Sequence, residues 1–403
     1  MKRTFAIISS MIVLAMLLSG CEKPLWMTMP DPSGKPAGEE PVTDWSGVAD
    51  SCTFVLVDNF LDKERGVFWT TPDNVQPANN IYWQQAHAMD VLVYSYERIK
   101  DTDPALAEEY IGYFRKWYAS DGGNYNDSHD SEGEYGAGGF FNAFTDDMCW
   151  ICLTLLHMSE ATGDDTYADT AREIYDNYII TRVWTGEEGL TGLPWQNNDA
   201  ENARNACTNA PGCLVAARLY QKYGVEAYLD DAVMLYDYVE GNLLYDDGRV
   251  EEPPLSYTQG TFGEACRQLY DITGERKYLR KADAVLLYAM TSGRCTNNGL
   301  LRDEGTSMDQ SIFKAVLIPY VVNYIMYDKA TVSTKDRLYE LLMDNAEALD
   351  ASLDRTLFPQ MYANYYWGTP FSGGVASMGA QTSGASLMEG VARLEKFLNE
   401  NAD

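Results

Sequence analysis

Apolar residues recur at helical spacing through most of the chain, and Gly, Asp and Pro residues interrupt them at fairly regular intervals. An apolar repeat of three to four residues is typical of helices with one buried face. From Trp45 onward the pattern therefore predicts an all-α protein. The twelve expected helices span residues 46–65, 79–99, 103–120, 146–161, 165–183, 205–223, 225–243, 257–273, 275–292, 308–328, 333–354 and 378–398.

Three of the expected turns share a pattern, Gly-x3-Tyr-x3-Ala. It occurs at Gly163/Tyr167/Ala171, Gly224/Tyr228/Ala232 and Gly274/Tyr278/Ala282, at intervals of 50 to 61 residues. A spacing of four keeps Tyr and Ala on the same helix face, so each of these helices should begin to pack in the same way. The pattern indicates a repeated helical hairpin.

The connections between the expected helices alternate in length. A long segment precedes every second helix, which we call inner, and a short turn follows it. The long segments are residues 66–78, 121–145, 184–204, 244–256, 293–307 and 355–377. In a closed ring of six hairpins, this order places all long connections and the N-termini of the inner helices on one face, where a site is expected. We predict an (α/α)6 barrel, with an open helical solenoid as the structural alternative.

The N-terminus resembles a bacterial lipoprotein signal. The apolar run from Phe5 to Leu18 is about 14 residues long, shorter than the roughly 20 that span a bilayer, and it ends in Leu18-Ser19-Gly20-Cys21. This ending predicts cleavage before Cys21 and acylation of its thiol, whereas an ordinary secretory signal would leave Cys21 incidental. We expect a signal peptide at 1–20, a lipidated Cys21 and Pro-rich tether at 21–45, and a catalytic domain at 46–403. The protein would be lipid-anchored at the outer membrane of a bacterial envelope, facing the periplasm or the exterior.

The charge restricts the partners. A formal net charge of -30 repels phosphate backbones and anionic polysaccharides, so nucleic acid is excluded and a neutral glycan is favoured. Membrane contact is expected through the lipid anchor only, and the protein is expected to be a monomer.

Cysteine and histidine usage points to no cofactor. Seven cysteines remain besides Cys21, and Cys149 and Cys152 form a CxxC inside an apolar helical run without a second such pair nearby. Buried thiols are therefore favoured over a metal or redox site.

Asp146 and Asp147 follow a Gly-rich and aromatic segment and open an apolar helix. One interpretation is helix capping, since acidic residues are favoured in a first turn. The other is catalysis. Neighbouring helical residues project about 100° apart, which can place two carboxyl groups on the order of 5 to 6 Å apart, as in retaining glycosidases. Helix amides would favour an ionised nucleophile, and repulsion would keep its neighbour protonated.

The other inner-helix openings present polar and aromatic side chains that suit sugar hydroxyls and C–H faces. Trp83 and Trp150 lie within expected helices and are predicted to be core residues, and His87 is predicted to be structural. The loop residues Trp195, Tyr365, Tyr366 and Trp367 are the better candidates for sugar subsites.

Five stretches carry a family resemblance. They are Tyr82-Trp83-Gln84-Gln85-Ala86-His87-Ala88-Met89-Asp90, Phe144-Thr145-Asp146-Asp147-Met148, Ala206-Cys207-Thr208-Asn209-Ala210-Pro211, Tyr257-Thr258-Gln259-Gly260, and Asp309-Gln310 with Phe313-Lys314. With them the chain resembles glycoside hydrolase family 76, the endo-α-1,6-mannanases, from Trp45 to the C-terminus. Thr145 and Thr258 depart from the residues usual in that family, as do Ala315 and Pro319.

The resemblance implies an (α/α)6 barrel and a retaining, endo-acting hydrolysis of α-1,6-linked mannan. It also implies Asp146 as the nucleophile and Asp147 as the acid/base. The residues expected to bind substrate are Tyr257, Gln259, Asn209, Asp309, Gln310 and Trp195.

Three rival functions stay open at this point. A non-catalytic glycan-binding lipoprotein would use the Asp doublet only as a cap. An (α/α)6 glycosidase could act on a different neutral glycan. An enzyme for uronic-acid glycans is disfavoured because such substrates usually need basic partners, and the chain has 30 Lys and Arg against 60 Asp and Glu.

Overall fold

A computed structural model describes residues 43–72, 82–120, 139–185, 191–196 and 204–401. These contain twelve α-helices, one for each expected helix. They are α2 (Trp45–Phe60), α3 (Tyr82–Ile99), α4 (Pro104–Ala119), α6 (Thr145–Thr162), α7 (Asp165–Ile174), α8 (Ala206–Tyr223), α9 (Glu226–Asn242), α10 (Ser256–Thr273), α11 (Arg276–Thr291), α12 (Met308–Met326), α13 (Val332–Ser352) and α14 (Met378–Glu400). The expected signal peptide, Cys21 and nearly all of the tether lie outside the described residues. No described helix is long and apolar enough to cross a bilayer.

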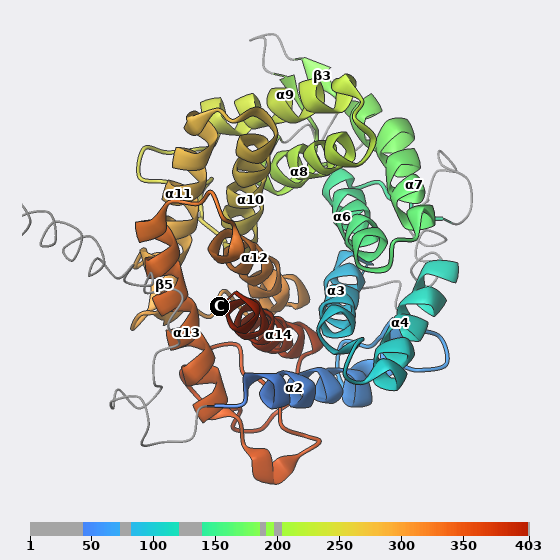
Figure 1. Ribbon diagram of the computed structural model, residues 1–403, viewed down its shortest axis with the longest axis vertical. Helices are drawn as coiled ribbons and strands as arrows, with labels where there is room; N and C mark the ends of the chain where they lie inside the picture. Colours follow the sequence, from blue (N-terminus) through green and yellow to red (C-terminus); the bar gives the residue numbers. More distant parts are fainter. Residues whose placement is uncertain (1–42, 73–81, 121–138, 186–190, 197–203, 402–403) are drawn as a thin grey trace, which may run out of the picture.

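The helices form two concentric rings, so the predicted (α/α)6 barrel is confirmed (Figure 1). The inner ring runs α3, α6, α8, α10, α12 and α14, and each member packs against the next. The outer ring holds α2, α4, α7, α9, α11 and α13. The ring closes because α14 packs against α12, α3 and α2, which rules out the open solenoid.

The short turns between inner and outer helices follow the repeat seen in the sequence. Gly163, Gly224 and Gly274 end α6, α8 and α10 with φ values of 74°, 66° and 71°. A residue with a β-carbon is strained in this left-handed conformation, which is why Gly ends each helix. The repeated Tyr and Ala side chains are all buried.

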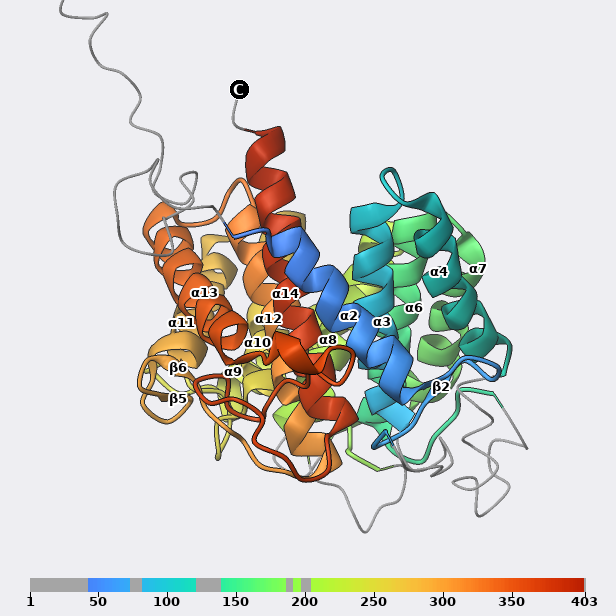
Figure 2. The same ribbon diagram turned by 90° about the horizontal axis from the view of Figure 1, so that it is seen from below.

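The long connections gather at the end of the barrel where the inner helices begin (Figure 2). Three of them contain a two-stranded hairpin: β1 (Leu61–Asp62) with β2 (Val67–Phe68), β3 (Trp184–Thr185) with β4 (Thr191–Gly192), and β5 (Thr296–Asn297) with β6 (Leu300–Leu301).

Two expected helix ends were wrong. The helix expected over 46–65 ends at Phe60, because the Asp62 carboxylate accepts the N–H groups of Glu64 and Arg65, both at 3.0 Å, and closes the β1–β2 turn. The helix expected over 165–183 is α-helical only to Ile174 and continues as π and 3₁₀ turns to Arg182.

In four inner helices, the fourth residue has an amide side chain. Each of these side chains forms hydrogen bonds with the backbone of the long connection that precedes its own helix. Gln85 bonds both backbone groups of Phe68 at 2.8 Å, and Asn209 bonds both backbone groups of Leu193 at 2.8 and 3.1 Å. Gln259 accepts the N–H of Val250, and Gln381 accepts the N–H of Ala363, at 2.5 and 2.9 Å. These amides attach the loops of one face to the barrel wall.

In four of the six hairpins, the connection that follows the hairpin also satisfies the first N–H group of its inner helix. Glu251 accepts the N–H of Ala206 at 2.9 Å, and Glu304 accepts that of Ser256 at 2.8 Å. Backbone carbonyls do the same for Thr145 and Met378. The first N–H groups of a helix have no partner within the helix. In these four inner helices, the connecting segments supply the acceptor.

The core is continuous through both rings and includes the cysteines. All seven cysteines in the described ranges are buried and unpaired, and these include Cys149 and Cys152, for which buried thiols were favoured. Cys152 and Cys213 occupy equivalent positions, and their thiols donate to the carbonyls of the repeated Ala171 and Ala232 at 3.4 and 3.2 Å.

A buried ion pair ties the two ends of the ring together. Glu389 of α14 is fully buried and accepts hydrogen bonds from Arg98 Nε of α3 at 2.7 Å and from Thr53 Oγ1 of α2 at 2.7 Å. Arg98 extends the network to Ser46 and Asp50 of α2 at 2.8 and 2.6 Å. One carboxylate thus joins the first two helices of the barrel to the last.

The variant Glu389→Gln keeps the shape of this side chain and removes its charge. We expect the free energy of unfolding to fall by about 3 kcal/mol, because the buried Arg98 guanidinium would keep only the exposed Asp50 as an ionic partner. Urea denaturation followed by far-UV circular dichroism measures the change. The matched control is Glu340→Gln, which breaks an exposed pair with Arg337 at 2.8 Å and should cost less than about 1 kcal/mol. Equal losses in the two variants would contradict the role given to Glu389.

Candidate active site

A cavity of about 410 Å³ lies at the loop-rich end of the barrel. Its walls come from the first turns of five inner helices and from the connection before α8. The described lining residues are Tyr82, Trp83, Gln84, Phe144, Asp146, Asp147, Trp150, Trp195, Asn205, Cys207, Tyr257, Asp309 and Phe313. This is the face on which the connection pattern placed a site.

The Asp doublet lies in the first turn of α6 and does not occupy the cap position. The N-cap residue is Phe144, which makes no side-chain cap hydrogen bond. Asp146 Oδ2 instead accepts a hydrogen bond from Trp195 Nε1 at 3.2 Å and one from Cys207 Sγ at 3.5 Å. Its buried Oδ1 has no hydrogen-bond partner among the described residues, so one lone-pair face of this carboxylate is unused by the protein.

Asp147 is held by the segment before the helix. Asn142 Nδ2 donates to Asp147 Oδ2 at 3.0 Å, while Asn142 Oδ1 accepts the N–H of Phe144 at 2.9 Å. Arg182 secures this segment through hydrogen bonds to the carbonyls of Asn142 and Ala143 at 2.9 and 3.2 Å. The π and 3₁₀ turns after α7 therefore end at Arg182, whose hydrogen bonds fix the segment that leads into α6.

The two carboxyl groups differ in electrostatic environment. Burial raises the pKa of Asp146 to about 7, and the hydrogen bonds from Cys207 and Trp195 oppose that rise. Burial also raises the pKa of Asp147 well above its usual range, and the negative charges of Asp146 and Asp309 raise it further. Asp147 is therefore the member that retains the proton, and Asp146 is the member that ionises first.

Four aromatic rings form the floor of the cavity. Tyr257 and Phe313 are stacked with their centroids 4.1 Å apart and their planes 11° apart, and Trp83 lies 6.3 and 6.1 Å from them. Trp150 packs against Trp83 at 6.2 Å. Beneath them His87 is buried, and burial lowers its pKa to about 4, so the ring is neutral.

The ionisable groups that line the cavity are all acidic. Asp309 accepts hydrogen bonds from Trp83 Nε1 at 3.1 Å and from Gln84 Nε2, which joins the first turns of α12 and α3. Among the described lining residues there are three Asp side chains and no Lys, Arg or His. The cavity suits a neutral ligand that offers hydroxyl groups and an apolar face.

The structure brings together five of the eight residues predicted for the site: Asp146, Asp147, Trp195, Tyr257 and Asp309. Asn209 and Gln259 are buried away from the cavity, because their amides hold the preceding loops. Gln310 is exposed and packs near Gly305 instead of lining the cavity.

Several lining residues were missed. Trp83 was predicted to be a core residue but is half-buried and lines the cavity. Trp150 is fully buried in the core, as predicted, and also borders the cavity. Trp367 is fully buried, and neither Tyr365 nor Tyr366 lines the described cavity. The position of a residue in the first turn of an inner helix could have identified some of them. The second residue of five inner helices faces the cavity, and these residues are Trp83, Asp146, Cys207, Tyr257 and Asp309.

Comparison with known families identifies this arrangement. The model of glycosyl hydrolase family 76 matches residues 45–399, which include every described helix almost to its end. The chain belongs to glycosyl hydrolase family 76. The protein is therefore a glycoside hydrolase by family, and no curated protein matches the chain.

Several solved structures share the fold of this chain. An inactive variant of the α-1,6-mannanase GH76A of Salegentibacter sp. HEL1_6, in complex with α-1,6-mannotetrose, has a TM-score of 0.75 and 23% identity, over 87% of this chain and 100% of that one. The Lin0763 protein of Listeria innocua has a TM-score of 0.73 and 22% identity, over 88% and 98%. A family 76 mannosidase of Bacteroides thetaiotaomicron has a TM-score of 0.68 and 17% identity, over 89% and 100%.

The variant Trp195→Phe tests the electrostatic description of the family 76 doublet. Loss of the indole N–H removes a hydrogen bond to ionised Asp146, so the pKa of Asp146 should rise. A hydrogen bond to a charged group contributes about 1.5 kcal/mol, and we expect the acidic limb of the pH profile of kcat/KM to move up by about one pH unit. Trp184→Phe changes an exposed Trp and should leave the limb in place. A downward shift for Trp195→Phe would contradict the description.

Proposed function

We propose that this protein is a retaining endo-α-1,6-mannanase, with Asp146 as the nucleophile and Asp147 as the acid/base. The observation that carries the proposal is the unequal environment of two adjacent carboxyl groups at one end of the barrel. Hydrogen bonds from Trp195 and Cys207 favour ionised Asp146, and the charges of Asp146 and Asp309 favour protonated Asp147. A double displacement needs one carboxylate of each kind.

In the first step, the Asp146 carboxylate attacks the anomeric carbon and forms a glycosyl ester. The bond to the leaving sugar oxygen breaks, and Asp147 gives its proton to that oxygen. In the second step, Asp147 accepts a proton from water, the water oxygen attacks the same carbon, and the ester bond to Asp146 breaks. Two inversions at one carbon retain its configuration.

Adjacency of the two residues supports retention over inversion. Neighbouring positions on a helix can hold carboxyl groups on the order of 5 to 6 Å apart, whereas an inverting enzyme needs roughly 6.5 to 9.5 Å to admit a water molecule.

The substrate proposal rests on the cavity and on related proteins. The aromatic floor and the absence of basic lining residues from the described part of the cavity favour a neutral sugar over a uronate. The Salegentibacter mannanase is inactive when two aspartates with consecutive numbers are both replaced, and it binds α-1,6-mannotetrose. A tetrasaccharide is a segment of a chain, which supports endo action.

Single replacements distinguish the nucleophile from the acid/base. With α-1,6-mannan as substrate, Asp146→Asn should abolish turnover, and Asp147→Asn should reduce it about 10²- to 10⁴-fold because acid catalysis is lost. With the 2,4-dinitrophenyl glycoside of α-1,6-mannobiose, the first bond cleavage needs no acid. A burst of dinitrophenolate should then return for Asp147→Asn and not for Asp146→Asn.

Product analysis checks the rest of the proposal. Wild-type protein should release a range of oligosaccharides whose first-formed anomer, followed by proton NMR, is α. Unchanged hydrolysis in either Asp variant would contradict the catalytic assignment. Binding of mannan without hydrolysis by the wild type would favour the glycan-binding alternative, and release of mannose alone would contradict endo action.

The cellular location is proposed from the sequence at residues 18–21. Cleavage before Cys21 and acylation of its thiol would anchor the enzyme to the outer membrane of a bacterial envelope. Wild-type protein expressed in a bacterial host should incorporate radiolabelled palmitate and sediment with membranes, and Cys21→Ala should do neither. Ser19→Ala is the matched control, since a small residue remains at that place. Release of the wild type into the soluble fraction would contradict anchoring.

A further inference from the structure

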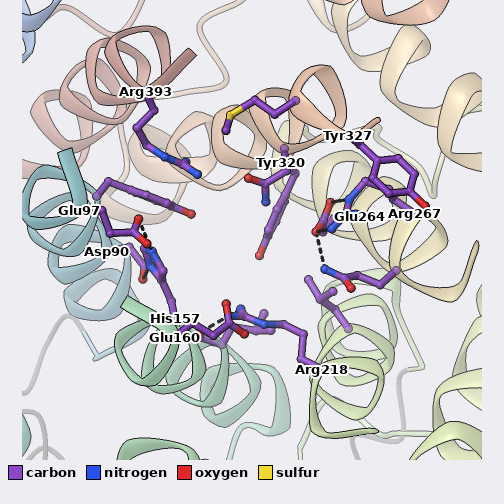
Figure 3. A pocket seen from close by; sticks show the side chains of 16 residues that line it. Asp90, Glu97, His157, Glu160, Arg218, Glu264, Arg267, Tyr320, Tyr327 and Arg393 are labelled. Carbon is purple, nitrogen blue, oxygen red and sulfur yellow. Dashed lines mark hydrogen bonds and ion pairs between the residues drawn. The ribbon is translucent and has the colours of Figure 1, made fainter. Parts of the chain in front are cut away.

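A second cavity, of about 310 Å³, lies at the opposite end of the barrel from the Asp146–Asp147 doublet. Figure 3 shows this cavity from close by. We call it the basal cavity. Its lining comes from the later turns of all six inner helices, so it lies on the axis of the barrel. Its volume is at the lower end of the roughly 300 to 1,000 Å³ found for small-molecule sites.

The basal cavity is separate from the catalytic cavity. Among the described residues, none lines both. His87 lies between them and contacts Trp83 and Trp150 at centroid distances of 5.4 and 5.2 Å, and a small space of about 20 Å³ lies beside it. A ligand can therefore bind in one cavity while the other is empty.

The carboxylates of the basal cavity are already paired with cations of the protein. Glu264 bonds Arg267 at 2.6 and 2.8 Å, and Glu160 lies 2.9 Å from Arg218. Asp90 and Glu97 flank His157 at 2.9 and 3.3 Å. Burial alone would lower the pKa of His157, but these two hydrogen bonds raise it to about 9, so the ring is cationic at neutral pH.

The groups that remain unpaired are mostly neutral. The hydroxyl groups of Tyr94 and Tyr320 and the amide of Asn323 make no hydrogen bond within the described ranges. Figure 3 shows the Tyr320 ring reaching into the middle of the cavity. Arg393 places its guanidinium over the Tyr94 ring at 4.4 Å, and its buried Nη1 has no partner among the described residues. Buried polar atoms usually have partners, so such an unused donor indicates a missing ligand or solvent.

The charge balance indicates the class of ligand. The four carboxylates of the cavity are offset by three guanidinium groups and His157. A cavity without net charge, in a protein of formal charge -30, does not favour an anion. Free hydroxyl, amide and guanidinium groups beside two Tyr rings suit a molecule with many hydroxyl groups and apolar C–H faces.

We propose that the basal cavity is a second, non-catalytic binding site for a small neutral sugar, with Tyr94, Tyr320, Asn323 and Arg393 as its contacts. The site is independent of the reaction proposed above, since it shares no lining residue with the doublet. It gives the enzyme a binding site for a mono- or disaccharide at the end away from the cleavage site.

Methyl-labelled methionine gives a separate signal for each end of the barrel. Met326 lies in the basal lining, and Met308 lies beside Asp309 at the catalytic end. In a titration with D-mannose, we expect the ¹³C-methyl resonance of Met326 to shift and to saturate. Tyr320→Phe and Asn323→Ala should each weaken this binding about 3- to 10-fold, since each removes one hydrogen-bonding group.

The matched control is Tyr327→Phe. Tyr327 also lines the basal cavity, but its hydroxyl donates to Asp271 at 2.9 Å, so its loss should leave the affinity unchanged. The Met326 shift should also persist in the Asp146→Asn/Asp147→Asn double variant. The basal cavity would therefore still bind D-mannose even if the protein did not hydrolyse mannan.

Three outcomes would overturn the proposal. Met326 could fail to respond to D-mannose, in which case the basal charges only complement the C-terminal ends of the inner helices. Met326 could respond to inorganic phosphate and not to mannose, which would make the cavity an anion site. Finally, Tyr320→Phe and Asn323→Ala, checked for folding by circular dichroism, could bind mannose as tightly as the wild type.

Discussion

Closure of the inner ring is the constraint on which the rest of this structure depends. The six hairpins contact mainly their neighbours, so the axis exists only when α14 packs between α12 and α3. The fully buried Glu389 carboxylate meets Arg98 and Thr53 at this seam. A buried charge needs its partners in place, so this network favours one register of the last helix against the first two. Because the first turns of the inner helices converge only in a closed ring, the cavity at the Asp146–Asp147 doublet depends on the same seam.

The first turn of an inner helix serves two functions at once. Its second residue faces the cavity, and its fourth residue, where that is Gln or Asn, holds the preceding long loop. Residues two apart along an α-helix differ by about 200° in direction, so the second and fourth side chains point to nearly opposite sides of the helix. This geometry explains why Tyr257 lines the cavity while Gln259, two residues later, bonds to Val250. It also joins the walls of the site to the loops around it.

The two ends of the barrel differ in the charges they carry. At the N-terminal end of the inner helices, three carboxyl groups share a small cavity, and burial raises the pKa of the doublet despite the favourable helix dipoles. At the C-terminal end, arginines and a cationic His157 pair with carboxylates and complement the negative ends of the dipoles. One end therefore holds carboxyl groups with altered pKa values, and the other holds ion pairs beside unpaired neutral groups.

The sequence by itself determined the number of helices, their order, the closed hairpin architecture and the face on which a site would lie. These features depend on apolar periodicity, Gly-terminated turns and connection lengths, all of which are local. It also identified the Asp146–Asp147 doublet, because two carboxylates at a helix start are visible without a fold. The tertiary structure alone decided how each helix is rotated about its own axis. That rotation brought Trp83 and Trp150 into the cavity and turned Asn209 and Gln259 away from it, because packing against two neighbours sets the angle. It also decided how the two carboxyl groups differ, since Trp195, Cys207 and Asp309 reach them from distant parts of the chain.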